Sequence, residues 1–280
     1  MSVHTTPTSA TSWSPDLITF DPQDVIPEAL ILQTSTVAGS VEGDQPAVRV
    51  PHVDDAEADF VAEGDEIPES DPVLAETTVY TGKVSQLIRI SREQWMQTNA
   101  ANLLSTSVER AVTNRANLAY IAQVAPTTGT TPPAGILHTE GVIEGDPIGD
   151  NLDPLADALA AIEAANGAPT HIIASPTAWS HLRKLKVATG SHEMLLGAGN
   201  GDAEKRIFNL PVLTSPAVPT GELVVVDRSA ILSAVGQVQV ATSEHTYFAS
   251  DSIALRCTWR FGQQTVRPDR IAHLSITPEA

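Results

Sequence analysis

The residue types that perform catalysis are present in this sequence, but their spacing forms no known site. The glycine-rich run GAGNGD places Gly197, Gly199 and Gly201 at alternate positions. This spacing matches neither the GxGxxG nor the GxxxxGK[ST] pattern that cradles phosphates. We therefore interpret the run as a flexible surface loop.

Histidine and cysteine, the usual ligands of transition metals, are equally scattered. The eight histidines include no HExxH motif and no pair four residues apart on a predicted helix. His171, His181 and His192 are therefore interpreted as ordinary surface or half-buried residues. Cys257 is the only cysteine, which excludes an intrachain disulfide and CxxC metal sites. Its strand-like surroundings favour a small buried hydrophobic residue.

Carboxylates could bind calcium, and serine could act as a nucleophile, yet neither pattern is complete. Asp146, Asp150, Asp153 and Asp157 lie close together, but they lack the order and the glycine of an EF-hand. No GxSxG nucleophile motif occurs. The sequence therefore predicts no catalytic residue, no metal site and no cofactor.

The charge of the whole chain restricts its partners. The 280 residues carry a formal net charge of -18, whereas a protein that binds DNA directly needs a basic surface. The same charge disfavours anionic membranes. The N-terminus lacks the basic and apolar regions of a signal peptide, and no apolar run has the length of a membrane span. We expect a soluble protein made in a reducing cytoplasm, with one large domain or two modest ones.

The negative charge is concentrated in one segment. Residues 42–76 contain twelve carboxylates and a single base, Arg49. The centre of this segment, FVAEGDEIPESDP, contributes Glu63, Asp65, Glu66, Glu69 and Asp71.

Basic residues cluster elsewhere, in two segments near 83–115 and 252–270. Those that we select as a candidate partner surface are Arg89, Arg92, Arg110, Arg115, Arg256 and Arg260. Opposite charges separated in this way favour a contact in which the acidic segment of one copy lies across the basic surface of a neighbouring copy.

The elements that position these charges can be read from the sequence pattern. Residues 1–40 are polar with scattered apolar anchors, which predicts an arm whose first twelve residues are disordered. Residues 47–53 and 77–91 alternate like strands. Two such strands flanking the acidic segment predict a long β-hairpin.

The next segment predicts the longest helix. Ser91 followed by Gln94 is a capping-box pattern, and neither glycine nor proline interrupts the chain before Pro126. A helix of roughly 30 residues would be roughly 45 to 50 Å long.

An α/β region follows. Asp153 as N-cap, Pro154 and Gly167 predict a helix over 154–165, and Ser175 caps a second helix that ends by Gly190. Strands are predicted at 171–175, 221–227 and 236–243.

The clearest strand is SIALRCTWRF, with one apolar and one basic face. Ile253, Leu255, Cys257, Trp259 and Phe261 alternate with Ala254, Arg256, Thr258 and Arg260. A last strand, RIAHLSI, closes the chain.

This succession of motifs resembles a known family. FVAEGDEIP in the hairpin, ISREQW before the long helix, PPAGIL, THIIASPTAWSHL, LPVLTSP, GELVVVDRS and ALRCTWRFGQQTVRPDRIAHL occur in the order found in tailed-bacteriophage major capsid proteins of the Hong Kong 97 phage type. The resemblance runs from about Phe20 to Ile276, and it rests on the order of weak motifs.

The resemblance implies an α+β phage major capsid fold with five parts. These would be an N-arm (1–40), an extended loop (41–82), a peripheral domain with a long spine helix (83–140), an α/β axial domain (141–235) and C-terminal strands that return through the peripheral domain (236–280), the last of them possibly axial. Pentamers and hexamers would form an icosahedral virion shell around double-stranded DNA, assembled in the host cytoplasm.

Two departures from the family pattern change what the resemblance implies. Some members carry a helical scaffolding segment before the arm, which this sequence lacks, so a separate scaffolding protein is expected besides the portal and a possible decoration protein. Some members form a Lys–Asn isopeptide crosslink from the loop. Residues 41–82 contain no lysine, and Lys83 lies only at the base, so we expect no such crosslink.

Two alternatives remain open on the sequence alone. An encapsulin-type nanocompartment shares the fold, but its usual N-terminal cargo-binding helix is not evident here. A soluble α/β enzyme or ligand-binding protein could use residues 150–235, and a pocket with convergent titratable groups there would favour it.

Overall fold

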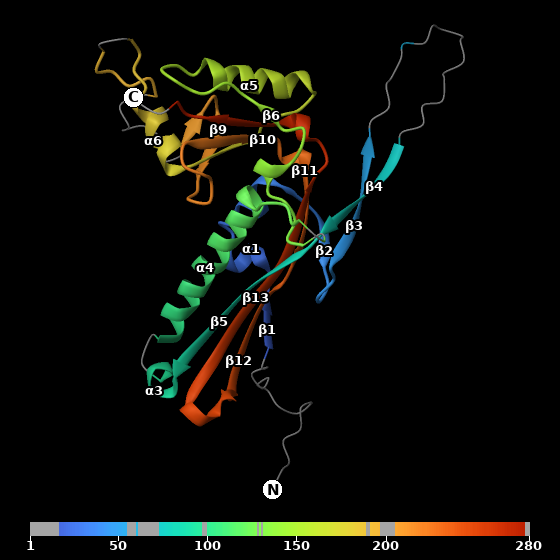
Figure 1. The fold of residues 1–280 in the computed structure, drawn as a ribbon, viewed down its shortest axis with the longest axis vertical. Coiled ribbons are helices and arrows are strands. Elements are labelled where there is room, and N and C mark those ends of the chain that lie inside the picture. Colours follow the sequence, from blue (N-terminus) through green and yellow to red (C-terminus); the bar gives the residue numbers. More distant parts are fainter. Residues whose placement is uncertain are drawn as a thin grey trace.

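The computed structural model describes residues 17–54, 60, 73–96, 100–127, 129, 131–188, 191–196 and 205–277. Two six-stranded sheets form the body, and a two-stranded hairpin projects from it (Figure 1). The structure thus has the predicted α+β class.

The first sheet contains the longest strands. Its order is β1-β12-β13-β11-β2, and β5 pairs with the other edge of β13. The strands are β1 (Leu17–Phe20), β2 (Thr36–Val41), β5 (Gly82–Ser91), β11 (Ile231–Gly236), β12 (Val238–Tyr247) and β13 (Ser252–Thr265). β13 runs beside β5 from Ser252↔Ser91 to Phe261↔Gly82, so the clearest predicted strand is the centre of this sheet.

The basic face predicted for this strand is only partly exposed. Arg256 is exposed, but Ala254 and Thr258 are 4% and 6% exposed. Both side chains are short, and each residue is paired with β12 on one side and with β5 on the other.

The predicted single helix from residue 91 is wrong in its first part. The structure has a short α3 (Arg92–Trp95) and a separate α4 (Ala100–Ala122). Ser91 does cap α3, because its hydroxyl accepts a hydrogen bond from the Gln94 N–H at 3.3 Å. The 23 residues of α4 give a helix of about 34 Å.

α4 lies against the first sheet through side chains spaced four residues apart. Val108, Val112, Ala116 and Tyr120 are all buried in one cluster with Trp259. This spacing places one stripe of α4 over the apolar face of β13.

The segment predicted as an arm contributes to this core. α1 (Pro22–Val25) and α2 (Leu30–Thr34) contribute residues to the cluster under α4, and β2 follows them in the chain. Asn117 Oδ1 accepts a hydrogen bond from the Leu30 N–H at 2.8 Å, and the hydroxyls of Thr34 and Tyr120 lie 2.9 Å apart. The region from Ile26 onward is therefore integral to the fold.

The hairpin is formed by β3 (Ala47–Asp54) and β4 (Val73–Tyr80). Its register runs from Ala47↔Tyr80 to Asp54↔Val73, which confirms the predicted hairpin. The predicted second strand, 77–91, is divided at Thr81, because its first part pairs with β3 and its remainder is β5. At the root, Val50 and Val79 pack against Leu232 and Ala234 of β11.

The second sheet has the order β6-β14-β10-β7-β9-β8. Its strands are β6 (Ile143–Glu144), β7 (His171–Ala174), β8 (Arg206–Ile207), β9 (Leu210–Thr214), β10 (Glu222–Val226) and β14 (Ile271–Ser275). The helices α5 (Asp153–Ala164) and α6 (Pro176–Lys184) pack with it in a second buried cluster. Short 3-10 turns are η2 (Ile136–His138), η3 (Arg228–Ala230), η4 (Phe248–Ser250) and η5 (Pro268–Arg270).

The helix ends correct one predicted cap and confirm another. α5 begins at Asp153 itself, with Leu152 at the N-cap position, whereas Ser175 caps α6 by accepting from the Ala178 N–H at 3.2 Å. α6 ends at Lys184, before the predicted Gly190. α5 ends in a Schellman motif in which Asn166 has the positive φ and the Gly167 N–H donates to Ile162 O at 2.9 Å.

The chain passes between the two sheets near its C-terminus. The predicted boundary at 235 falls inside β11, which belongs to the first sheet, and β14 belongs to the second sheet. In the described part of the chain, no helix has the length and apolarity needed to cross a membrane.

Candidate assembly surfaces

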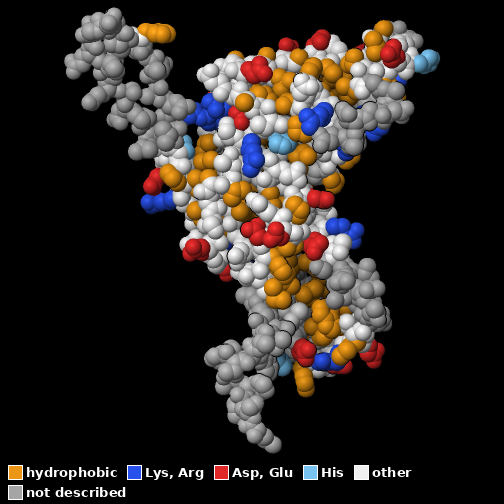
Figure 2. Space-filling view, turned by 180° about the vertical axis from the view of Figure 1, so that it is seen from behind, with side chains coloured by type: hydrophobic (Ala, Val, Ile, Leu, Met, Phe, Trp, Pro, Cys, Tyr) orange, Lys and Arg blue, Asp and Glu red, His pale blue; other side chains and the backbone are white. Residues whose placement is uncertain are grey.

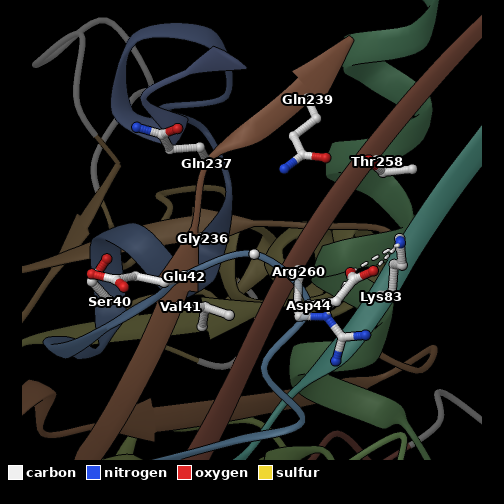
Figure 3. A pocket seen from close by; sticks show the side chains of 11 residues that line it. Ser40, Val41, Glu42, Asp44, Lys83, Gly236, Gln237, Gln239, Thr258 and Arg260 are labelled. Atoms are coloured by element: carbon white, nitrogen blue, oxygen red, sulfur yellow. Dashed lines mark hydrogen bonds and ion pairs between the residues drawn. The ribbon is translucent and has the colours of Figure 1, made fainter. Parts of the chain in front are cut away.

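A charged cluster at the root of the hairpin joins it to the first sheet. Lys83 Nζ donates to both carboxylate oxygens of Asp44 at 3.0 and 3.2 Å, as Figure 3 shows. Arg260 Nε lies 3.5 Å from Asp44 Oδ1. The hydrogen bond from Lys83, and then the charges of Lys83 and Arg260, lower the pKa of the Asp44 carboxyl. Asp44 therefore stays ionised and links the β2–β3 turn to β5 and β13.

A second set of bonds fixes the end of β4. Arg260 Nη1 donates to Thr81 Oγ1 at 3.0 Å, and Thr81 Oγ1 donates to Gln45 O at 2.6 Å. Thr81 is fully buried. A Cβ atom at Gly262 would lie 2.1 Å from Tyr80 O, so β13 and the hairpin meet backbone to backbone. Only glycine permits this approach.

Four cations share the face of β5 and β13 that is turned away from α4. Cross-strand partners lie on the same face of a sheet, and the register pairs Lys83 with Arg260, Leu87 with Arg256 and Arg89 with Ala254. The intervening Trp259 and Cys257 pack in the cluster under α4. We call the surface formed by Lys83, Arg89, Arg256 and Arg260 the basic face.

The members of the basic face differ in availability. Lys83 and Arg260 already contact Asp44, and the Arg89 guanidinium lies 4.9 Å from the ring centre of Tyr247, a cation–π distance. Arg256 is exposed.

Arg92, Arg110 and Arg115 lie outside the basic face. Arg92 bonds Asp251 at 2.9 Å and Glu244 at 3.3 Å, and these bonds raise the pKa of its guanidinium. It therefore anchors α3 to the end of the β12–β13 pair. Arg110 and Arg115 lie on α4, in the other layer, where Arg115 Nη2 donates to Gln123 Oε1 at 2.8 Å. The structure thus divides the six predicted arginines among three places.

The predicted acidic contact residues, Glu63, Asp65, Glu66, Glu69 and Asp71, lie outside the described residues. Asp44, Thr81 and Gly262 were missed by the sequence reasoning. For Gly262 a signal existed, because glycine inside a strand often marks a close backbone approach.

Exposed apolar side chains gather at the narrow end of the molecule. Figure 2 shows them from behind, below the wider half. Near the ends of β5 and β12, Leu87, Met96 and Phe248 are 57%, 76% and 83% exposed. Large exposed apolar patches mark surfaces that bind partners.

Burial changes the pKa of two groups that were considered for catalysis. Burial, and then Glu109, raise the pKa of Cys257 to about 11, so its thiol is protonated. Burial, and then the charge of Arg228, lower the pKa of His171. In the described ranges no three His, Cys, Asp or Glu side chains converge as a metal site.

Solved structures of phage capsids have the same fold as this chain. A chain from Gordonia phage Cozz aligns with a TM-score of 0.67 and 16% identity, covering 90% of this chain and 87% of that one. A chain from Microbacterium phage Oxtober96 aligns with a TM-score of 0.68 and 15% identity, covering 100% of this chain and 96% of that one. A chain described as "Capsid of empty GTA particle computed with C5 symmetry" aligns with a TM-score of 0.66 and 15% identity, covering 90% of each chain. The fold is therefore of the phage capsid class.

The sequence supports the same class through a family model. The model of the Phage capsid family matches residues 26–276, which is most of the chain, so the protein belongs to this family. It is a structural component of bacteriophage capsids and not an enzyme. No curated protein matches its sequence.

Proposed function

We propose that this protein is a major capsid protein whose pentamers and hexamers form an icosahedral shell around the double-stranded DNA of a tailed bacteriophage. The observation that carries the proposal is the projecting hairpin, whose root is fixed to the body by Asp44, Thr81 and Gly262. A rigid projection is suited to contact another subunit. The net charge of -18 suits an enclosed DNA that is not bound sequence-specifically.

The hairpin of one subunit contacts the basic face of the next. The loop carboxylates, Glu63, Asp65, Glu66, Glu69 and Asp71, supply the negative charge in this proposal. Arg89 and Arg256 are their principal partners, because Arg92 and Arg260 already contact carboxylates of their own chain. Arg110 and Arg115 lie on α4, outside the basic face.

The five predicted parts of the chain fit this assembly with small changes. The extended loop comprises 41–82. The first sheet with α4 forms the peripheral domain, which includes β11. The second sheet with α5 and α6 forms the axial domain, which includes β14. Residues 1–40 remain the N-arm, of which α2 and β2 are built into the peripheral domain.

Electron microscopy tests the proposal directly. The protein is expressed alone and together with its neighbouring viral genes, and the particles are imaged and assayed for nucleic acid. Uniform icosahedral shells support the proposal. Shells that form only on co-expression would show that assembly requires a separate scaffolding or portal protein. A monomer under both conditions overturns the proposal, and shells that enclose a protein cargo in place of DNA would identify a nanocompartment.

Charge reversal tests the contact. Arg256→Glu is expected to reduce shell formation, while Arg256→Lys, which keeps the charge, leaves it intact. Combining Arg256→Glu with Glu66→Arg should restore part of the loss. Equal assembly of the wild type and Arg256→Glu would refute this contact and leave the capsid function standing.

A further inference from the structure

A mostly apolar cleft opens beside the start of β5, between that strand and α4. Its volume is about 390 Å³. Apolar side chains lining it include Val84, Ala119, Pro133 and Phe261. An apolar cavity of about 150 Å³ is enough to hold benzene, so the cleft can accept an aromatic side chain together with part of its backbone.

A buried glutamine forms part of the floor of the cleft. Gln263 lines it and is 4% exposed. Its Nε2 donates to Tyr120 O at 3.2 Å and Ala134 O at 3.1 Å, but its Oε1 is buried without a donor among the described residues. Because its Oε1 is buried, Gln263 shapes the floor of the cleft and is not itself a contact for an incoming peptide.

The rim of the cleft is positively charged. Arg115 and Lys83 both line it. Arg115 Nη2 donates a hydrogen bond to Gln123, whose side chain is neutral and leaves the positive charge of Arg115 in place. A partner with an aromatic side chain next to carboxylates would therefore match both the floor and the rim.

The chain itself contains such a segment. Phe60 is 110% exposed, and in the sequence Asp59 precedes it and Glu63 follows closely. Its exposure shows that Phe60 does not occupy the cleft of its own subunit. A fully exposed phenyl ring gains free energy when a partner buries it.

We infer that Phe60 of one subunit inserts into the cleft of a neighbouring subunit, where it contacts the apolar floor and Arg115 faces the flanking carboxylates. The inference rests on the proposed function, and it names the pocket that holds the hairpin. The cleft lies beside β5, the strand that also carries Lys83 and Arg89 of the basic face. One loop could thus contact both the cleft and the basic face.

Cysteine crosslinking in assembled particles tests the inference. Phe60→Cys combined with Val84→Cys, whose side chain lies on the α4 side of β5 and lines the cleft, is expected to give covalently linked subunits on mild oxidation. Phe60→Cys with Asp157→Cys, on the exposed surface of α5, is the matched control and should not crosslink. Cys257 is buried and does not interfere.

Truncation provides an independent measurement. Phe60→Ala should leave the unfolding of the free subunit unchanged, because the side chain has no contacts there. It should weaken subunit association by about tenfold or more, as expected for a buried aromatic anchor. Phe208→Ala, the same change at an exposed phenylalanine between β8 and β9 of the second sheet, is the control.

The outcomes separate the two proposals. Shells that form without the Phe60–Val84 crosslink, and that resist dissociation equally with Phe60→Ala, overturn the insertion but keep the capsid function. Absence of shells for the wild type with its neighbouring genes overturns both.

Discussion

Replacing Gly262 by alanine should displace the hairpin root. The added Cβ would lie 2.1 Å from Tyr80 O and 2.9 Å from Tyr80 C. Carbon and oxygen atoms without a covalent bond approach only to about 3.3 Å, so the backbones must separate by about 1 Å. Both neighbours are backbone atoms in paired strands, and no side-chain rotation can relieve the overlap.

The free-energy cost follows from the contacts that this shift breaks. Overpacking alone costs about 1 to 3 kcal/mol. The shift also strains the bonds from Thr81 to Gln45 and from Arg260 to Thr81, and a neutral hydrogen bond contributes about 1 kcal/mol. We therefore expect the free energy of unfolding to fall by about 2 to 4 kcal/mol.

Denaturant unfolding of the unassembled subunit measures this change. Gly149→Ala is the matched control, because a Cβ at Gly149 meets nothing within 4 Å, and it should change stability by less than about 0.5 kcal/mol. A Gly262→Ala subunit as stable as the control would refute the close approach. The same variant should assemble poorly even where the subunit remains folded, because its hairpin is misplaced.

Three further changes test other parts of the structure. Asn117→Ala leaves the buried Leu30 N–H without its 2.8 Å acceptor and should cost about 1 to 3 kcal/mol in denaturant unfolding; an unchanged midpoint would contradict that bond. The pKa of Asp44 is lower in the folded subunit than its unfolded value of 3.8. The ionised carboxylate therefore stabilises the fold at pH values above 3.8, and this stabilisation is lost as the pH falls through the folded pKa. Asp44→Asn should therefore reduce the acid dependence of unfolding measured from pH 5 downward, and an identical pH profile would exclude the contribution. Cys257, with its raised pKa of about 11, should react with a thiol reagent at pH 7 only after unfolding, and rapid labelling of the folded subunit would refute its burial.

Local chemistry was predictable from sequence where neighbouring residues determine it. Ser91 and Ser175 cap helices as expected, since a cap needs only the next three residues. The alternation of apolar and polar residues in β13 and in the hairpin strands could also be predicted, because it too depends on neighbouring residues. The end of α3 at Trp95 could not be predicted, because no glycine or proline marks it. The family order of motifs supplied the architecture that local patterns could not.

The charged site was only partly predictable because its contacts join distant segments. Arg92 bonds Asp251 and Glu244, which lie about 150 residues away in the sequence. Counting basic residues along the chain cannot reveal that such a guanidinium is already engaged. Nor can it show that Arg115 faces a different layer from Arg256.

The root of the hairpin limits which cations a neighbouring loop can use. Asp44 belongs to the acidic segment itself, yet it binds Lys83 and lies beside Arg260 within one subunit. Part of the segregated charge is therefore used to orient the hairpin. A neighbouring loop gains most from cations without such a carboxylate, which directs it along β5 toward Arg256 and Arg89. Charge alone would let the loop slide along this face, whereas insertion of Phe60 into a shaped cleft would fix its register.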